Sequence, residues 1–279
     1  MLATLCCNLF DNYNSDRGEN ANNLITNTIK NLCIEILVLP YKLKSDYNNC
    51  IFFQRSNLDN GVIFLNCNFR IKVNGNNKND YIKIFEINCV IAASSIRSNI
   101  TFRSCIFNIE ARNCVFKLYS YRTGRASNNF IFDKCMINLK CINIQNSTHN
   151  TMFSAYNTYV EDCGIYIENN SDYPLFLCDY VYNNTSTHYY YFGNSYIIYK
   201  SDSNKGLYLT NGSSTTASYL DSLFKTKCFY DKEISNGLLY EKSSSTVTIE
   251  DKCSNMLALT TEQCKDAAYL ASMGFGIST

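Results

Sequence analysis

The sequence has no Trp, only two Pro and two His, and 11 Gly among its 279 residues. So few Pro and Gly exclude collagen-like repeats and Pro-rich disordered chains. The sequence also lacks an excess of either charge, with 25 Lys and Arg against 24 Asp and Glu. Nonspecific nucleic-acid binding needs a concentrated positive field, so no nucleic-acid partner is expected. No apolar run reaches the roughly 20 residues of a membrane-spanning helix, so no membrane association is expected either.

The residues present in excess are neutral and polar. Asn occupies 38 positions and Tyr 22, whereas charged residues make up 18% of the chain. Hydrophobic residues make up 46%, which is enough for a large core. The composition indicates a folded protein whose surface is covered by hydrogen-bonding rather than charged side chains.

Fifteen cysteines are present, an odd number in a long chain, which favours reduced thiols over a disulfide framework. No Cys-x-x-Cys motif occurs, and His149 and His188 lack metal-ligand spacing, so neither a metal nor another cofactor is expected. The apolar stretch from Leu2 to Phe10 has no basic residue before it and no small-residue cleavage site after it. It fits a signal peptide poorly, and residues 1–19 are interpreted as an N-terminal arm.

Eight of the cysteines share one pattern. Each is followed after two residues by an apolar or aromatic residue, and seven are followed by another after four. Three residues before the Cys, seven of the eight positions are again apolar or aromatic. The repeating unit is apolar-x-x-Cys-x-apolar-x-apolar. Its cysteines are Cys50, Cys67, Cys89, Cys105, Cys114, Cys135, Cys163 and Cys178.

The spacing around each Cys predicts a tight corner between two short strands. Alternation after the Cys has the period of a strand with one buried face, and the two-residue gap before it shifts the phase. Asn tolerates the left-handed conformation that such a corner needs. It precedes the Cys in four units, at Asn49, Asn66, Asn88 and Asn113. Strands meeting at a repeated corner predict stacked coils that average about 18 residues.

An antiparallel sandwich is the alternative, but a sandwich has no reason to keep one corner chemistry at every second strand. In stacked coils, equivalent thiols such as Cys67, Cys135 and Cys163 would form an inward ladder, and Asn amides could bond from coil to coil. The nine-residue step from Cys105 to Cys114 is too short for a coil, so one of these two must lie on a different face. The sequence predicts an all-β solenoid.

The segment before the repeats has two parts. Residues 20–32 (NANNLITNTIKNL) space their apolar side chains as a helix does, and residues 33–45 (CIEILVLPYKLKS) read as extended. This order, together with units such as Asn66-Cys67-Asn68-Phe69, resembles the pectate-lyase-like right-handed parallel β-helix family, particularly phage tailspikes and related virion proteins. The resemblance covers about residues 20–200. It implies a right-handed single-stranded parallel β-helix with an N-terminal capping helix.

Residues 201–279 depart from the repeat and predict a small C-terminal part that is β-rich and helical. Thr260-Thr-Glu-Gln263 has the sequence of a capping box, which predicts a helix through about Ser272 that Gly274 ends. This part could cover the open end of the solenoid, where strand edges would be unpaired, or it could form a trimer contact.

Motifs for nucleophiles and phosphate-binding loops are absent from the sequence, which leaves glycan cleavage by paired carboxylates as the enzymatic possibility. If the units align, Asp133 and Glu161 stack in neighbouring coils about 4.8 Å apart. Carboxyl groups about 5 Å apart suit a retaining glycosidase. The preferred alternative is a solvated corner with mutually neutralising charges, which Arg103 and Arg112 would complete.

A Tyr-rich run from Tyr180 to Tyr199 includes three consecutive residues, Tyr189, Tyr190 and Tyr191. Exposed Tyr rings can stack on sugars, so these three are candidates for glycan binding. The preferred alternative is packing within the last coils or at a subunit interface. Trp, the commonest sugar platform, is absent.

The function implied by the resemblance is that of a viral or bacteriophage structural protein, namely a tailspike, tail fibre or decoration protein. It would assemble in the host cytoplasm as a homotrimer, join other virion proteins and attach to host-surface polysaccharide. A polysaccharide depolymerase, either hydrolase or lyase, on the same β-helix is the alternative. A cell-surface adhesin is a third hypothesis, which the poor match to a signal peptide disfavours. Fold alone does not decide among these functions.

Overall fold

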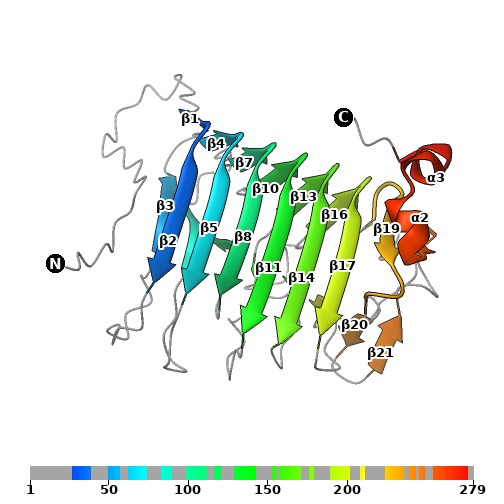
Figure 1. Ribbon diagram of the computed structural model, residues 1–279. Coiled ribbons are helices and arrows are strands. Elements are labelled where there is room, and N and C mark those ends of the chain that lie inside the picture. Colours follow the sequence, from blue (N-terminus) through cyan, green and yellow to red (C-terminus); the bar gives the residue numbers. More distant parts are fainter. Residues whose placement is uncertain are drawn as a thin grey trace.

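A computed structural model shows a described chain built almost entirely from β-strands, with two short helices near its end (Figure 1). Among the described strands, every pair except one is parallel. The prediction of an all-β fold is confirmed, and parallel pairing is incompatible with an antiparallel sandwich. The structure describes residues 27–38, 50–56, 62–73, 83–89, 99–111, 116–120, 129–142, 153–154, 157–170, 176–178, 189–201, 208–210, 224–235, 239–242, 245–248 and 254–275.

The strands belong to three sheets, A, B and C, which the chain visits in rotation. From β1 to β18, each three consecutive strands place one strand in each sheet, and we call such a set a repeat. Sheet A contains β1 (Asn27–Lys30), β4 (Val62–Leu65), β7 (Asn99–Arg103), β10 (Asn129–Asp133), β13 (Asn157–Glu161) and β16 (Tyr189–Gly193). Sheet B contains β2 (Cys33–Val38), β5 (Asn68–Val73), β8 (Ile106–Ala111), β11 (Met136–Ile142), β14 (Gly164–Asn170), β17 (Tyr196–Ser201), β19 (Cys228–Asp231) and β22 (Met256–Leu259).

Sheet C continues the rotation and ends with the antiparallel pair, β20 and β21. It contains β3 (Cys50–Ser56), β6 (Lys83–Cys89), β9 (Phe116–Ser120), β12 (Phe153–Ser154), β15 (Phe176–Cys178), β18 (Tyr208–Thr210), β20 (Leu239–Lys242) and β21 (Ser245–Thr248). Sheets B and C therefore extend past residue 200. Strands of sheet B form one long row in Figure 1, and the helices lie at its end beside β19.

Each repeat is longer than the predicted coil of about 18 residues. Partners in sheet B that hold the same place in successive repeats, such as Asn68, Ile106, Met136 and Gly164, lie 38, 30 and 28 residues apart. The predicted period is wrong because the eight aligned cysteines mix different places in the repeat. Four lie at the corner between sheets A and B. Cys50, Cys89 and Cys178 instead lie in strands of sheet C, and Cys114 is outside the described residues.

The corner between sheets A and B is formed by one left-handed residue. Asn66 has a φ of 54°, as predicted. Asn88 instead lies inside β6, and Asn49 and Asn113 are outside the described residues. Each corner amide except the last donates to the next repeat's strand in sheet A, for example from Asn66 to the carbonyl of Arg103 at 3.0 Å. The left-handed residues are Asn31, Asn66, Ser104, Lys134, Asp162 and Asn194, with φ from 45° to 59°.

Lys134 offers a test of this corner because its side chain is exposed and its φ is 56°. We expect Lys134→Val to lower the free energy of unfolding by about 1–3 kcal/mol, since a β-branched side chain is strained at positive φ. Lys134→Asn is the matched control and should change it by less than about 0.5 kcal/mol. Urea unfolding measures both, and equal stability of the two variants would contradict this description of the corner.

The predicted capping helix over residues 20–32 is wrong where the structure describes it. Residues 27–30 form β1, which pairs in register with β4, and Cys33 begins β2. The three-residue step from Ile29 to Leu32 crosses the left-handed corner at Asn31, and this step imitates the spacing of a helix. Residues 20–26 lie outside the described residues.

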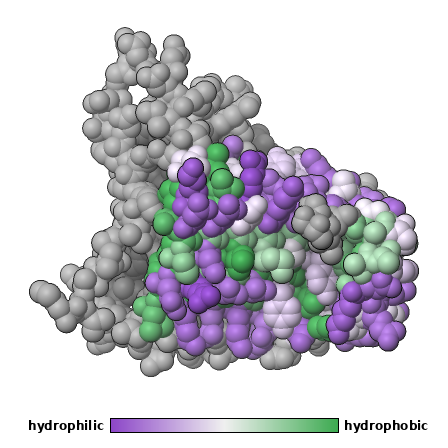
Figure 2. All heavy atoms as spheres, turned by 45° about the horizontal axis from the view of Figure 1, so that its top comes forward, coloured by the Kyte–Doolittle hydropathy of each residue, from purple (hydrophilic) through white to green (hydrophobic). Residues whose placement is uncertain are grey.

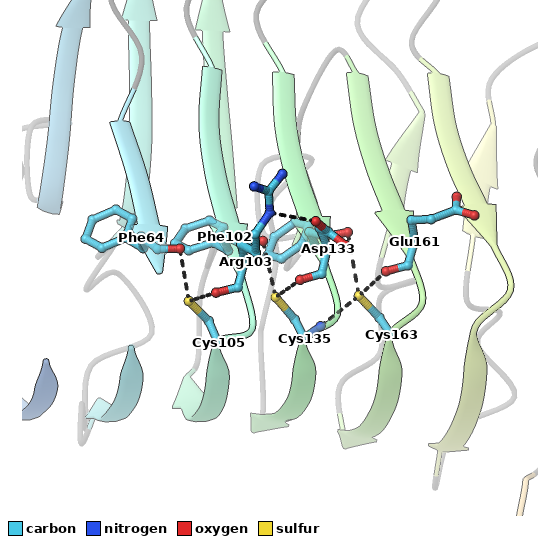
Figure 3. Close-up of polar contacts among 9 residues, drawn as sticks. Phe64, Phe102, Arg103, Cys105, Asp133, Cys135, Glu161 and Cys163 are labelled. Atoms are coloured by element: carbon cyan, nitrogen blue, oxygen red, sulfur yellow. Dashed lines mark hydrogen bonds and ion pairs between the residues drawn. The ribbon is translucent and has the colours of Figure 1, made fainter. Parts of the chain in front are cut away.

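Cysteines line the inside of the same corner in four successive repeats. Cys67, Cys105, Cys135 and Cys163 are at most 3% exposed, so the predicted inward ladder is confirmed for these four. All four thiols donate to carbonyl groups of sheet A, and Figure 3 shows this for Cys105, Cys135 and Cys163. The Cys135 thiol, for example, lies 3.3 Å from the oxygen of Phe102 and 3.4 Å from that of Asp133. The described cysteines form no disulfide.

Ser195 takes the place of the cysteine in the repeat after Cys163. Its hydroxyl donates to the carbonyl of Gly193 at 2.7 Å and accepts from the amide of Cys163 at 3.2 Å. Ser195 is fully buried, as the thiols are. In five successive repeats, the inward position of this corner therefore holds a small side chain that donates a hydrogen bond.

Aromatic rings fill the space between sheets A and B. Phe64, Phe102 and Phe132 stack along sheet A with centroid distances of 5.3 and 5.1 Å. Phe69 and Phe107 form a second column on sheet B, 5.0 Å apart. The two columns meet edge to face, with the rings of Phe102 and Phe107 4.9 Å apart. Parallel pairing in register produces these columns because it places equivalent side chains directly above one another.

The predicted capping box is present at the first of the two helices, α2 (Thr261–Lys265). The Thr260 hydroxyl accepts from the amide of Gln263 at 3.2 Å, and the Gln263 side chain accepts from the amide of Thr260 at 2.9 Å. The predicted single helix is divided at Asp266, whose carboxylate caps α3 (Ala267–Ser272).

Both helices pack on the last strands of sheet B. Phe229 and Leu259 of the sheet form one buried cluster with Leu270 and Phe275. Gly274 follows α3 with a φ of 85°. None of the described helices is long and apolar enough to cross a membrane.

Candidate functional site

The two carboxylates predicted to stack do lie at equivalent places. Asp133 ends β10 and Glu161 ends β13, and the two residues are register partners in sheet A. Arg103 of β7 precedes them in the same row, and Gly193 of β16 follows. Arg112 lies outside the described residues.

The side chains of the two carboxylates point in different directions (Figure 3). Asp133 pairs with Arg103, with 2.7 Å between Oδ2 and Nε. Glu161 turns away toward Gly193, where its carboxyl group occupies the space that a Cβ would need. Desolvation, followed by the negative charge of Asp162, raises the pKa of Glu161, and the nearby Lys225 partly offsets this. The arrangement matches the charged-corner alternative better than two carboxyl groups facing one bond.

The predicted Tyr candidates lie on β16, and Tyr191 packs against neighbouring residues. Its ring stacks on that of Tyr159, the register partner in β13, at a centroid distance of 5.0 Å. The ammonium group of Lys225 lies 4.2 Å from the centre of the Tyr191 ring. Tyr189 and Tyr190 belong to the same strand, but their side chains are outside the described residues. Tyr191 is thus part of a packed aromatic and cationic cluster.

The outward face of sheet B carries a shallow, open depression, here called the groove, that the sequence analysis did not find. The groove has a volume of about 470 Å³ and crosses β2, β5, β8, β11 and β14. Because successive side chains of a strand alternate between faces, each strand contributes two outward residues to the groove. The surface over sheets A and B mixes hydrophilic side chains with hydrophobic patches (Figure 2).

One line of outward residues, the central row, is rich in hydrogen-bonding groups. Asn138 donates its amide to the oxygen of Asn108 at 3.0 Å, which links two neighbouring repeats. A side-chain amide has two N–H donors and an acceptor oxygen, so both residues keep capacity for a ligand. Tyr166 places an aromatic ring at the end of the row. The central row consists of Glu35, Arg70, Asn108, Asn138 and Tyr166.

The second line, the charged row, alternates in sign. Lys72 pairs with Glu110 at 3.3 Å. Lys140 pairs with Glu168 at 3.2 Å. The hydrogen bond and the charge of Glu168 raise the pKa of Lys140. The charged row consists of Lys72, Glu110, Lys140 and Glu168 and continues to Lys200 on β17.

The alignment of the corner cysteines contains the signal for both rows. The third and fifth residues after Cys67 are Arg70 and Lys72, and the same positions after Cys135 are Asn138 and Lys140. The fifth residue alternates between Lys and Glu through four repeats. Sequence reasoning used only the apolar positions of the unit and therefore missed this face.

The described residues contain no cluster of His, Cys, Asp or Glu that could hold a metal ion. The chemistry available in the groove is hydrogen bonding, ion pairing and ring stacking. Comparison with known protein families, curated proteins and solved structures gives no match to this chain.

Proposed function

We propose that the three sheets wind as a right-handed single-stranded parallel β-helix, and that the protein is a virion structural protein that attaches to host-surface polysaccharide. Rotation of the strands through sheets A, B and C supports the β-helix. Connections between parallel strands of one sheet are nearly always right-handed, which supports the hand. The resemblance of the repeats to tailspike proteins supports placement in a bacteriophage or another virus.

The groove on sheet B is the observation that carries the attachment function. It runs across five strands and therefore along the direction in which the repeats stack. A linear polymer can make equivalent contacts with each strand it crosses, and a polysaccharide supplies hydroxyl groups for the amides and a ring face for Tyr166. Attachment without cleavage is the better-supported form. Asp133 is in an ion pair with Arg103, and the Glu161 side chain points away from Asp133, so the two carboxyl groups do not face one glycosidic bond.

Binding to a panel of purified bacterial surface polysaccharides, both capsules and lipopolysaccharides, tests this function. We expect at least one to bind, and Asn108→Ala with Asn138→Ala to weaken that binding about tenfold or more, since two adjacent hydrogen-bonding side chains are lost. The matched control is Asp133→Asn with Glu161→Gln, which should bind normally. No reducing ends or unsaturated sugars should form.

Two outcomes would count against this function. Absence of binding to every member of the panel would refute attachment. Cleavage that the Asp133→Asn, Glu161→Gln variant abolishes would establish the depolymerase instead. The proposed homotrimer is tested by the mass in solution, and placement in a virion by identifying the proteins of purified particles.

A further inference from the structure

We propose that the groove on sheet B takes an uncharged linear glycan lying along the stack of repeats. This proposal rests on the attachment function and names the class of polysaccharide that the groove would bind. Three observations support it: the equal numbers of positive and negative side chains in the groove, the spacing of its strands, and the hydrogen-bonding groups of the central row.

The groove has no net charge to offer a charged polymer. Three cationic side chains line it, Arg70, Lys72 and Lys140, and three anionic ones, Glu35, Glu110 and Glu168. Within the charged row, Lys72 and Lys140 are each paired with a glutamate at 3.2–3.3 Å. A polyanion would have to displace these pairs and would still face the glutamates, which costs binding free energy.

The direction of the groove sets the direction of the ligand. Neighbouring strands are about 4.8 Å apart, so five strands span about 19 Å from first to last. A β-linked pyranose unit advances along its chain by a length close to one strand spacing. The groove therefore fits about four sugar units, each above one interval between strands.

The central row matches the surface of an uncharged sugar. Hydroxyl groups both donate and accept, as the amides of Asn108 and Asn138 do. The ammonium group of Lys200 lies over the ring of Tyr166, 5.8 Å from its centre, so the opposite face of the ring and the hydroxyl group are what Tyr166 offers to a sugar. Hydrogen bonding to an uncharged ligand needs no rearrangement of the charged row.

The first experiment sorts the panel of polysaccharides into uncharged and anionic members and measures each at low and at physiological salt. We expect the uncharged members to account for binding, with an affinity that changes less than about threefold with salt. Fragments of a bound polysaccharide should gain affinity with length up to about four units and little beyond.

The outcomes separate this proposal from the attachment function. Binding that is confined to anionic polysaccharides and falls steeply with salt would overturn the uncharged ligand, while attachment itself would stand. Affinity that continues to rise well beyond four units would contradict the extent of the groove. No binding to any member refutes the attachment function itself.

A charge variant gives a second, independent readout. Glu110→Gln with Glu168→Gln removes two negative charges from the groove at almost constant size and frees Lys72 and Lys140 from their pairs. We expect this variant to gain binding to an anionic polysaccharide such as heparin by about tenfold at low salt, and to lose that gain at high salt. The two glutamates are partly exposed on the sheet surface, so the variant should remain folded.

The control for this experiment is Asp133→Asn with Glu161→Gln, which makes the same change in net charge on sheet A. It should not gain heparin binding. An equal gain in both variants would mean that heparin responds to the net charge of the whole protein. It would overturn the proposal that the balanced charges of the groove exclude anionic polysaccharides.

Discussion

Replacing Phe102 with alanine should lower the free energy of unfolding by about 3–5 kcal/mol, the largest effect expected from a single core substitution. The ring is fully buried in the middle of the aromatic column on sheet A. It stacks between Phe64 and Phe132 and meets Phe107 at its edge. The cavity left by the ring would lie between the preceding and the following repeat. Backbone hydrogen bonds of the sheets fix the distance between these repeats, so they cannot move together to fill the cavity.

Urea unfolding followed by circular dichroism measures this effect. The control is Ile106→Ala, which also removes a large apolar side chain from the neighbouring strand β8, but one that is 43% exposed. We expect a loss below about 1 kcal/mol for the control. If the two variants lose similar stability, the rings of the interior do not form the continuous column described above.

The second large effect concerns the reactivity of the corner thiols. A hydrogen bond from Cys105 lowers the pKa of the Cys135 thiol, but the contact with Cys163 and burial outweigh it, so the pKa rises from 9.0 to about 12. Contact with Cys135, together with burial, raises the pKa of Cys105 as well. At pH 8.5 a pKa of about 12 lowers the thiolate fraction about a thousandfold.

Alkylation of the folded protein with iodoacetamide at pH 8.5 should therefore modify the exposed Cys33 quickly and leave Cys105 and Cys135 unmodified until the chain unfolds. Mass spectrometry of peptides gives the rate at each site. In urea all three should react at similar rates, which is the control for intrinsic reactivity. Modification of Cys135 as fast as that of Cys33 in the native protein would contradict the inward ladder.

The raised pKa of Cys135 also gives stability a defined dependence on pH. The unfolded chain releases this proton near pH 9, whereas the folded protein holds it until about pH 12. Between these values the unfolded state binds fewer protons, so the free energy of unfolding falls as pH rises through this range.

Sequence reasoning succeeded where one residue type repeats at one structural place. The inward cysteines, the corner at Asn66 and the capping box at Thr260 were predicted because each depends on local spacing and on the chemistry of one or two side chains. Stacking of Asp133 on Glu161 followed from the same alignment.

The errors arose where different places in the fold share one local pattern. Strands of sheet C also contain Cys near alternating apolar residues. Cys89 and Cys178 were therefore aligned with the cysteines at the corner between sheets A and B, although they lie in sheet C. The step from Ile29 to Leu32 has the same length in a helical turn and across a corner. The groove was missed because only the apolar positions of the unit were compared, although the third and fifth residues after each corner cysteine lie side by side on the outward face.

Ser195 shows that sulfur itself is dispensable in the ladder. The Ser195 hydroxyl takes the place that a thiol has in the four preceding repeats. It donates to a carbonyl group of the strand that precedes the corner, as those thiols do. One repeat of the protein thus already has this corner without an oxidisable sulfur. Replacing the other corner thiols with serine would therefore remove the groups that oxidants attack while keeping a hydrogen-bond donor at each of these corners.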